Sequence, residues 1–156
     1  MRIHLLAVGT RMPTWVDEAY HEYARRMPKE CNLVLREIPA ARRTKGSSTK
    51  QQIDQEGERV IAAIPRNSIV VALDLRGCLW STEKLASYLS CWLRSGQSLT
   101  LMIGGPDGLS ESCFRRADDH WSLSPLTFPH QMARIIVAEQ LFRAWSMIHN
   151  HPYHRA

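Results

Sequence analysis

The chain has 156 residues, close to the commonest size of one domain, and 44% of them are hydrophobic. A chain of this length buries enough surface for a hydrophobic core without disulfide or metal staples. No apolar run approaches the ~20 residues that cross a bilayer, so we expect no membrane segment. The net charge of +5 suits a polyanionic partner such as RNA but identifies none.

The four cysteines are widely spaced, and no two of them form a C-x-x-C pair. This usage is typical of reduced thiols, so we expect a cytoplasmic protein rather than one held by a disulfide framework. Zinc ligands scattered over such distances are the less favoured alternative.

The first half of the chain predicts two strand–helix pairs. The apolar run 3–8 predicts a strand and not a signal peptide, because it has no long hydrophobic region and no cleavage site. Helical spacing follows over 13–28, with a proline where the first turn would begin. Residues 32–38 predict the second strand and 50–64 the second helix. The basic, aperiodic segment 39–50 between them predicts a mobile loop.

The second half repeats the alternation of strands and helices, with strands expected at 68–75, 98–103 and 121–124. A helix is expected between Ser81, which can cap its N-terminus, and Gly96, which can end it. Further helices are expected near 110–118 and over 130–148. Such alternation predicts an α/β fold with a mostly parallel sheet and helices on both faces. We find no linker and no repeat, so we expect a single domain over residues 1–156.

The segment "IGGPDGLS" (103–110) is the first candidate site, because it directly follows a buried strand. Ligands of open α/β sheets bind beyond the carboxyl ends of the strands. Glycines there allow a ligand to approach the backbone closely. The spacing is not that of a dinucleotide fingerprint, and a simple strand-to-helix turn remains the alternative.

The second candidate is the segment 123–145, which joins a proline-containing loop to the last helix. Such a loop can present backbone N–H and C=O groups to a flat heterocycle. On the helix, Arg134, Glu139 and Arg143 interrupt an otherwise apolar sequence. The alternative is a core helix whose charged side chains face solvent.

The third candidate is the C-terminal tail "HNHPYHRA" (149–156), which holds three histidines. Its spacing resembles a metal cluster, but no acidic residue or cysteine is adjacent, so zinc would need ligands from elsewhere. The residues leave two alternatives open: a disordered tail, or a tail docked in a site that uses histidine and arginine.

Five stretches together are similar to one family, the bacterial ribosomal large-subunit pseudouridine N3-methyltransferases, which are trefoil-knotted SPOUT methyltransferases. The similarity runs in order from Met1 to Arg155. The stretches are "AVGTRMPTWVDEAYHEYARRMP", "IVVALDLRGCLWS", "LMIGGPDGLS", "WSLSPLTFPH" and "FRAWSMIHNHPYHR".

This resemblance implies a C-terminal trefoil knot, in which the helix after His130 passes through a loop, a topology that generic folding rules would not propose. It implies a cytoplasmic homodimer with its active site near the subunit interface. The implied methyl donor is S-adenosylmethionine, bound in the knot, and no metal is needed. The implied substrate is a pseudouridine of 23S rRNA in the assembled 70S ribosome.

The resemblance also places the cofactor contacts. Pro125 replaces what is often a small residue and lacks a backbone donor, so we expect it to contribute only its carbonyl or its shape. The expected cofactor-binding residues are Leu73, Gly104, Leu123, Ser124, Pro125, Leu126, Thr127 and Phe128.

For catalysis, N3 of a uracil-type ring must lose its proton before it accepts a methyl group. His154 is the expected general base, since an imidazole titrates near neutral pH. Arg155 can bind a phosphate or a ring carbonyl oxygen, and Tyr153 can stack on the base or hydrogen-bond to it. The expected contacts to the RNA backbone are Arg143, Arg42, Arg43 and Lys45, each of which could instead be a solvated charge.

Three alternatives remain at this stage. A non-catalytic ribosome-binding factor on a knotted scaffold would need no open cofactor pocket. A knotted methyltransferase for a different RNA nucleotide would differ only in the position it modifies. A metallohydrolase that uses the tail histidines is the most distant alternative.

Overall fold

A computed structural model describes residues 1–155. Its centre is a five-stranded sheet in the order β2-β1-β4-β3-β5, in which every neighbouring pair is parallel. The expectation of a mostly parallel sheet is therefore confirmed. The strands are β1 (Arg2–Val8), β2 (Asn32–Ile38), β3 (Ser68–Leu79), β4 (Ser98–Ile103) and β5 (Asp119–Ser122).

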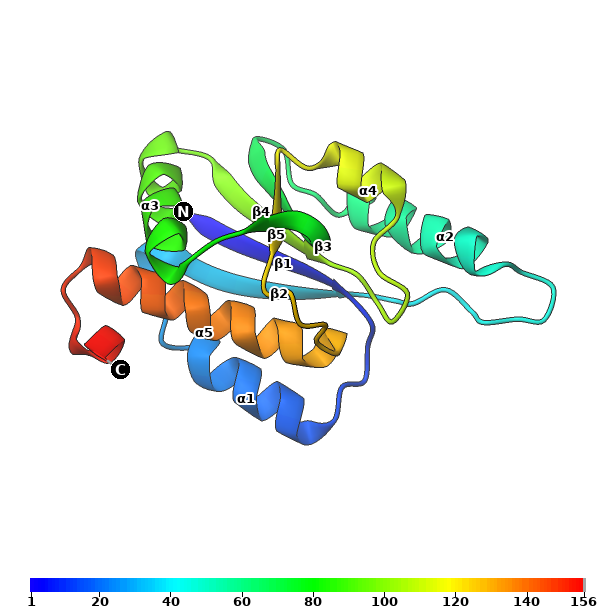
Figure 1. Cartoon of the computed structure of the whole chain (residues 1–156), viewed down its shortest axis with the longest axis horizontal. Coiled ribbons are helices and arrows are strands. Elements are labelled where there is room, and N and C mark those ends of the chain that lie inside the picture. The colour runs from blue at the N-terminus through cyan, green and yellow to red at the C-terminus, as the bar shows by residue number, and fades with distance from the viewer. Residues whose placement is uncertain (156) are drawn as a thin grey trace.

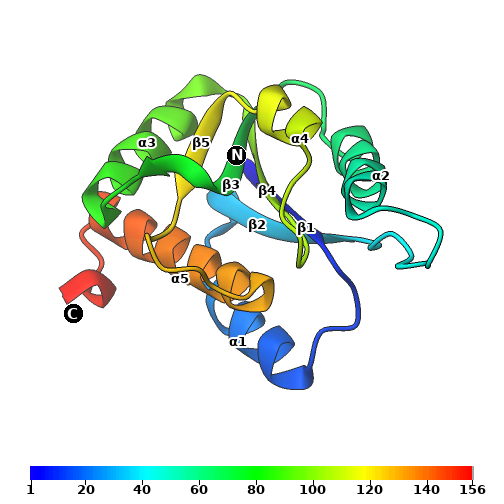
Figure 2. The same cartoon turned by 45° about the vertical axis from the view of Figure 1, so that its right-hand side comes forward.

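Helices cover both faces of the sheet, as expected (Figures 1 and 2). On one face lie α1 (Thr14–Ala24), α3 (Thr82–Ser95) and α5 (His130–Ile148); on the other lie α2 (Thr49–Ala62) and α4 (Glu111–Arg116). Two short 3₁₀ helices, η1 (Lys29–Cys31) and η2 (Pro152–Arg155), complete the described structure.

Each central strand supplies both cores, because successive side chains point to opposite faces of the sheet. Leu5 and Leu101 belong to the core beneath α1, α3 and α5, whereas Leu6 and Met102 belong to the core beneath α2 and α4. All four side chains are fully buried. This double burial explains why the strands are continuous apolar runs rather than alternating ones.

The predicted helix ends of α3 are confirmed. The Ser81 hydroxyl accepts a hydrogen bond from the backbone N–H of Lys84 at 3.1 Å. Gly96 ends the helix with a left-handed φ of 75°, a conformation that glycine adopts without a steric penalty. These two signals are local, which is why the sequence alone located them.

The edge of the sheet at β3 and β5 differs from the sequence prediction. β3 continues to Leu79 and pairs twice with β5, with a register shift between Leu73 and Cys78. β5 ends at Ser122, so the predicted strand 121–124 is partly wrong: residues 123 and 124 lie in the following loop. The cause is the irregular β3 segment, where a Cβ on Gly77 would lie 2.6 Å from the carbonyl carbon of His120. Periodicity cannot reveal such a contact between distant strands.

No helix within residues 1–155 is both long enough and apolar enough to cross a membrane.

Candidate active site

A cavity of about 760 Å³ opens at the carboxyl ends of β3, β4 and β5. The first residues of α5, among them His130 and Ala133, close one side of it. The rest of its lining comes from three segments: 73–75 within β3, 103–109 at the end of β4 and in the loop after it, and most of 121–129 at the end of β5 and in the loop after it. This is the edge at which parallel sheets bind ligands.

The structure brings together nearly all the residues that the sequence assigned to the cofactor. Pro125 lies in the same loop but does not line the cavity, so its expected contact is not supported. The predicted cofactor residues that line the cavity are Leu73, Gly104, Leu123, Ser124, Leu126, Thr127 and Phe128.

The loop after β4 is a tight turn built on three glycines. Gly105 and Gly108 pair across it, and the Gly108 N–H donates to the Gly105 carbonyl at 3.0 Å. Gly108 has a left-handed φ of 87°. A Cβ on Gly104 would lie 2.4 Å from the carbonyl carbon of Gly108. The turn therefore brings the backbone of three glycines to the cavity, beside Pro106, Asp107 and Leu109.

Two buried polar atoms belong to residues of the cavity lining and have no hydrogen-bond partner within residues 1–155. They are Nδ1 of His130 and the indole Nε1 of Trp121. Buried polar atoms in native proteins are nearly always satisfied, so unpaired ones at a cavity indicate a missing ligand or water. Sequence reasoning did not assign either residue to the site.

Behind His130 lies Arg134, which is only 1% exposed. Its guanidinium donates to Glu37 Oε2 at 2.7 Å and to the Gly9 carbonyl at 2.8 Å. These contacts join α5 to the carboxyl ends of β1 and β2. The interpretation of the charges on α5 as solvent-facing is therefore wrong for Arg134, because the tertiary fold buries it against an acidic partner.

We expect His130 to stay neutral at physiological pH. Burial lowers its pKa below the usual 6.5, and the positive charge of Arg134 adds to the effect. An NMR titration of the His130 imidazole should therefore give a midpoint below 6.5. Arg134→Met should raise that midpoint only part of the way, because burial is the larger cause. Since protonation favours the unfolded state here, His130 should reduce stability as the pH falls below 6.5. A midpoint at or above 6.5 would contradict the assignment.

The C-terminal tail is docked and not frayed. η2 folds back onto α5, where the Tyr153 hydroxyl donates to Glu139 Oε1 at 3.0 Å. The Tyr153 ring packs edge-on against Phe142, and the guanidinium groups of Arg143 and Arg26 lie 5.0 and 5.8 Å from its centroid. Burial, followed by the hydrogen bond to Glu139, raises the pKa of Tyr153 to about 12.

Glu139 is the centre of this tail cluster, although the sequence showed it only as a charge on a helix. Its Oε1 also accepts from Arg143 Nε at 2.9 Å, and its Oε2 accepts from Gln140 at 2.7 Å. Gln140 in turn accepts from the Thr82 hydroxyl at 2.8 Å. The i, i+4 spacing of Glu139 and Arg143 was the only sequence signal for this ion pair.

His154 faces α5, with its Nδ1 3.3 Å from the Ser146 hydroxyl. That hydroxyl donates its single proton to the Arg143 carbonyl at 2.7 Å. We therefore assign the Nδ1–H tautomer, in which Nε2 carries the free lone pair. Arg155 is exposed and has no hydrogen-bond or ion-pair partner within the described chain.

The basic side chains of the loop 39–50 differ in whether they form ion pairs. Arg43 is held in ion pairs with the buried Glu56, at 3.1 Å, and with Asp107 of the cavity loop, at 2.9 Å. Arg42 and Lys45 are exposed and belong to no ion pair in the described part of the chain. Within residues 1–155, no three His, Cys, Asp or Glu side chains are grouped to hold a metal ion.

The tail and the cavity lie toward opposite ends of α5. His130 lines the cavity at the first position of the helix, whereas His154 contacts Ser146, sixteen positions further on. At 1.5 Å per residue, this separation is roughly 24 Å along the helix axis. One chain therefore does not place its own His154 beside its own cavity (Figure 1).

A cavity at the carboxyl edge of a parallel sheet is the place where α/β proteins of this class bind their ligands. Residues 1–154 match the family described as "Predicted SPOUT methyltransferase". The chain belongs to this family and is a methyltransferase, and the expected SPOUT fold class is confirmed.

Two similar relatives are both named "Ribosomal RNA large subunit methyltransferase H". The protein of Methylococcus capsulatus is 52% identical, with 99% of this chain and 100% of the relative covered. That of Thioalkalivibrio sulfidiphilus is 54% identical, with 99% of each covered. A probable methylase family protein of Haemophilus influenzae has a similar fold, with a TM-score of 0.57 at 13% identity; the match covers 99% of this chain and 70% of that one.

Proposed function

We propose that this protein is an S-adenosylmethionine-dependent methyltransferase of the bacterial cytoplasm that methylates N3 of a pseudouridine in 23S rRNA of the assembled ribosome. Relatives of about 50% identity named for a large-subunit rRNA methyltransferase support the substrate class. The observation that carries the proposal is the cavity at the edge of the sheet, which gathers the residues expected to hold the cofactor.

The residues of this cavity fit S-adenosylmethionine. Gly104 packs so closely on the backbone of Gly108 and Leu109 that an added Cβ would displace the turn that lines the cavity. Leu73, Leu123 and Phe128 supply apolar walls for a flat adenine ring, and Thr127 supplies a hydroxyl. The unpaired Nδ1 of His130 is available to the bound ligand. When bound, the cofactor supplies an electrophilic methyl group on its sulfonium.

The tail residues divide the remaining chemistry between them. Tyr153 does not act as the base, because its raised pKa of about 12 keeps its hydroxyl protonated and donating to Glu139. His154 Nε2 accepts the N3 proton of the pseudouridine. Arg155, which is exposed, binds a phosphate or the ring carbonyl oxygen on which charge develops. Arg143 orients Glu139, and Arg42 and Lys45 contact the RNA backbone.

The separation of tail and cavity along α5 leads us to propose a homodimer with composite sites. Proton removal requires the base within hydrogen-bond reach of the acceptor, so the tail must come from the second chain. Exposed apolar side chains on the cavity loop and on the first turns of α1 and α5 are available for such an interface. Trp15 and Met132, in the first turns of the packed helices α1 and α5, are 54% and 37% exposed, and Leu126 is 70% exposed.

His154→Ala should lower the rate of methyl transfer to unmodified ribosomes about a thousandfold, since general-base catalysis contributes factors of this order. Cofactor affinity, measured by calorimetry, should stay unchanged because His154 lies far from its own cavity. His149→Ala is the matched control, an exposed histidine at the end of α5, and should retain activity. Undiminished transfer by His154→Ala would remove it as the base.

Mixing two impaired variants, at a cofactor concentration that saturates the wild type but not Gly104→Ala, tests the composite site. Gly104→Ala damages the cavity, and His154→Ala damages the tail. If each site combines the cavity of one chain with the tail of the other, random mixing should restore about a quarter of wild-type activity, because half of the dimers then contain one intact site. No recovery after verified subunit exchange would contradict the composite site. Mapping the methylated nucleotide by mass spectrometry tests the proposed position.

A further inference from the structure

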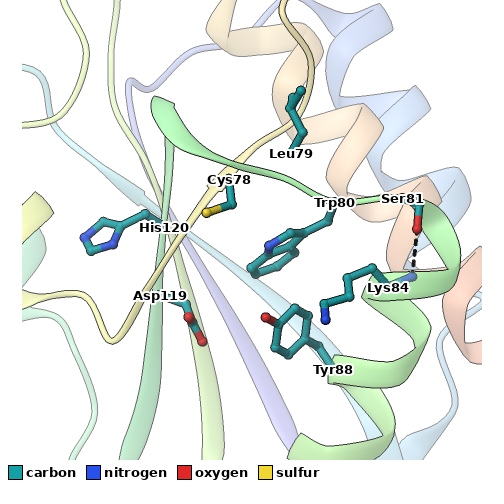
Figure 3. A pocket seen from close by; sticks show the side chains of 8 residues that line it. All are labelled: Cys78, Leu79, Trp80, Ser81, Lys84, Tyr88, Asp119 and His120. Atoms are coloured by element: carbon teal, nitrogen blue, oxygen red, sulfur yellow. Dashed lines mark hydrogen bonds between the residues drawn. The ribbon is translucent and has the colours of Figure 1, made fainter.

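A second cavity, of about 620 Å³, lies between the end of β3, the start of α3 and β5 (Figure 3). It shares no lining residue with the cofactor cavity, and the proposed mechanism does not use it. Its lining residues are Cys78, Leu79, Trp80, Ser81, Lys84, Tyr88, Asp119 and His120.

One wall of this cavity is aromatic and rigidly held. The Trp80 ring stacks on Trp121 at 5.1 Å with an interplanar angle of 12°, and its centroid lies 4.5 Å from that of Tyr88. Tyr88 in turn stacks on the buried Trp92 at 5.6 Å. Trp80 lines this second cavity, and Trp121 lines the cofactor cavity. The two cavities therefore lie on either side of the stacked Trp80–Trp121 pair.

Charged and polar groups that lack protein partners line the same space: Asp119 and Tyr88 are half-buried, and Lys84 is exposed at its rim. Figure 3 shows Asp119 on the strand side and Lys84 and Tyr88 on the helix side. None of these three side chains has a hydrogen-bond or ion-pair partner within residues 1–155; Lys84 Nζ only lies 5.1 Å from the Tyr88 ring centroid. By contrast, Asp74, close by on β3, is paired with Arg76 at 3.0 Å. Unpaired groups of opposite charge beside an aromatic wall are the features of a ligand site.

We propose that this cavity binds a guanine base of the substrate RNA, at a nucleotide other than the one methylated. The proposal rests on the proposed function, which supplies the RNA. Guanine presents two adjacent N–H donors, N1–H and N2–H, to a carboxylate such as Asp119, and its O6 accepts from an ammonium such as Lys84. Along the same edge adenine and uracil each offer a carboxylate only one N–H donor, so neither can form the two parallel hydrogen bonds to Asp119 that guanine forms. A base splayed out of an RNA loop exposes this edge.

The position of the cavity allows one RNA to reach both it and the tail. Ser81 lines the cavity, and the next residue, Thr82, donates to Gln140 at 2.8 Å. Gln140 donates to Glu139, which holds Tyr153. The cavity is thus connected through two side chains to the tail cluster of the same chain.

Asp119→Asn and Lys84→Gln test the proposal, with Glu83→Gln as the matched control, since Glu83 is exposed in the same turn of α3 but does not line the cavity. Wild-type protein should bind GMP more tightly than AMP in ligand-observed NMR, and Asp119→Asn should abolish the preference. On unmodified ribosomes, Asp119→Asn and Lys84→Gln should each raise KM about tenfold, as expected for loss of a base-edge contact. Their kcat and cofactor affinity should stay unchanged, as should all values of the control.

Two results would each overturn the proposal: GMP bound no more tightly than AMP by the wild-type chain, or an unchanged KM for Asp119→Asn. Cofactor calorimetry and thermal unfolding separate these outcomes from misfolding, because a folded variant keeps both values. Failure of the proposed function is a different result. In that case wild-type protein transfers no methyl group to any ribosome, whereas the GMP preference and its dependence on Asp119 are measured without methyl transfer.

Discussion

Gly104→Ala is expected to weaken S-adenosylmethionine binding about a hundredfold, because forcing a side chain into a filled space costs of the order of 1–3 kcal/mol. The added Cβ would lie 2.4 Å from the carbonyl carbon of Gly108 and 2.6 Å from the Leu109 nitrogen. Both are backbone atoms, so no rotamer change relieves the clash. The turn that lines the cavity must therefore shift. Calorimetric titration with the cofactor measures the effect.

Two other glycines provide graded controls for this substitution. Gly46, in the basic loop, has no atom within 4 Å of an added Cβ, so Gly46→Ala should bind the cofactor normally. Gly105→Ala should have an intermediate effect, since its nearest neighbour is the Val8 side chain at 3.1 Å, which can move. Unchanged affinity in folded Gly104→Ala would show that the turn does not contact the cofactor.

Glu37→Gln is expected to lower the free energy of unfolding by about 1–2 kcal/mol, less than for a fully buried ion pair, because the Glu37 side chain is 33% exposed and solvent screens part of the lost charge. The loss of stability arises because the buried Arg134 loses its negatively charged partner. Arg134 is 1% exposed and keeps its positive charge, with only the Gly9 carbonyl and a neutral amide to replace the carboxylate. Urea denaturation of the two proteins measures the difference.

The double variant Glu37→Gln/Arg134→Met distinguishes lost charge pairing from lost packing. It leaves no buried charge, so it should be more stable than Glu37→Gln alone. Glu18→Gln, an exposed carboxylate on α1, should change stability by less than about 0.5 kcal/mol. If the double variant were less stable than Glu37→Gln, the methylene packing of Arg134, rather than its charge, would carry the contribution.

The strands and helices were predictable because their signals are local. A strand buried on both faces is a continuous apolar run, and Leu5, Leu6 and Leu101 belong to such runs. Ser81 and Gly96 marked the ends of α3 through the chemistry of their own backbones. The exception is the edge between β3 and β5, where the register shift beside Gly77 depends on a contact with His120, which is 43 positions further along the chain.

The candidate site was predictable only where a family resemblance supplied the positions. From the residues alone, the loop containing Gly104 was identified as a candidate ligand site. For the tail, the residues did not distinguish a disordered state from a docked one. The burial of Arg134 and the partners of Glu139 had no sequence signal beyond spacing on a helix, because both depend on residues from other elements. His130 likewise gave no sign that its Nδ1 is unpaired.

Local chemistry along the chain was enough to establish the α/β fold class, most of its helices and strands and the glycine turn after β4, because apolar period, caps and φ preferences act over a few residues. The long-range arrangement decided the rest. It buried Arg134 against Glu37, closed the tail onto Glu139, and set His154 roughly 24 Å along α5 from the start of the cavity. These contacts depend on how helices and strands pack in space. Packing brings together residues that are far apart in the sequence, and their spacing along the chain does not predict the contact.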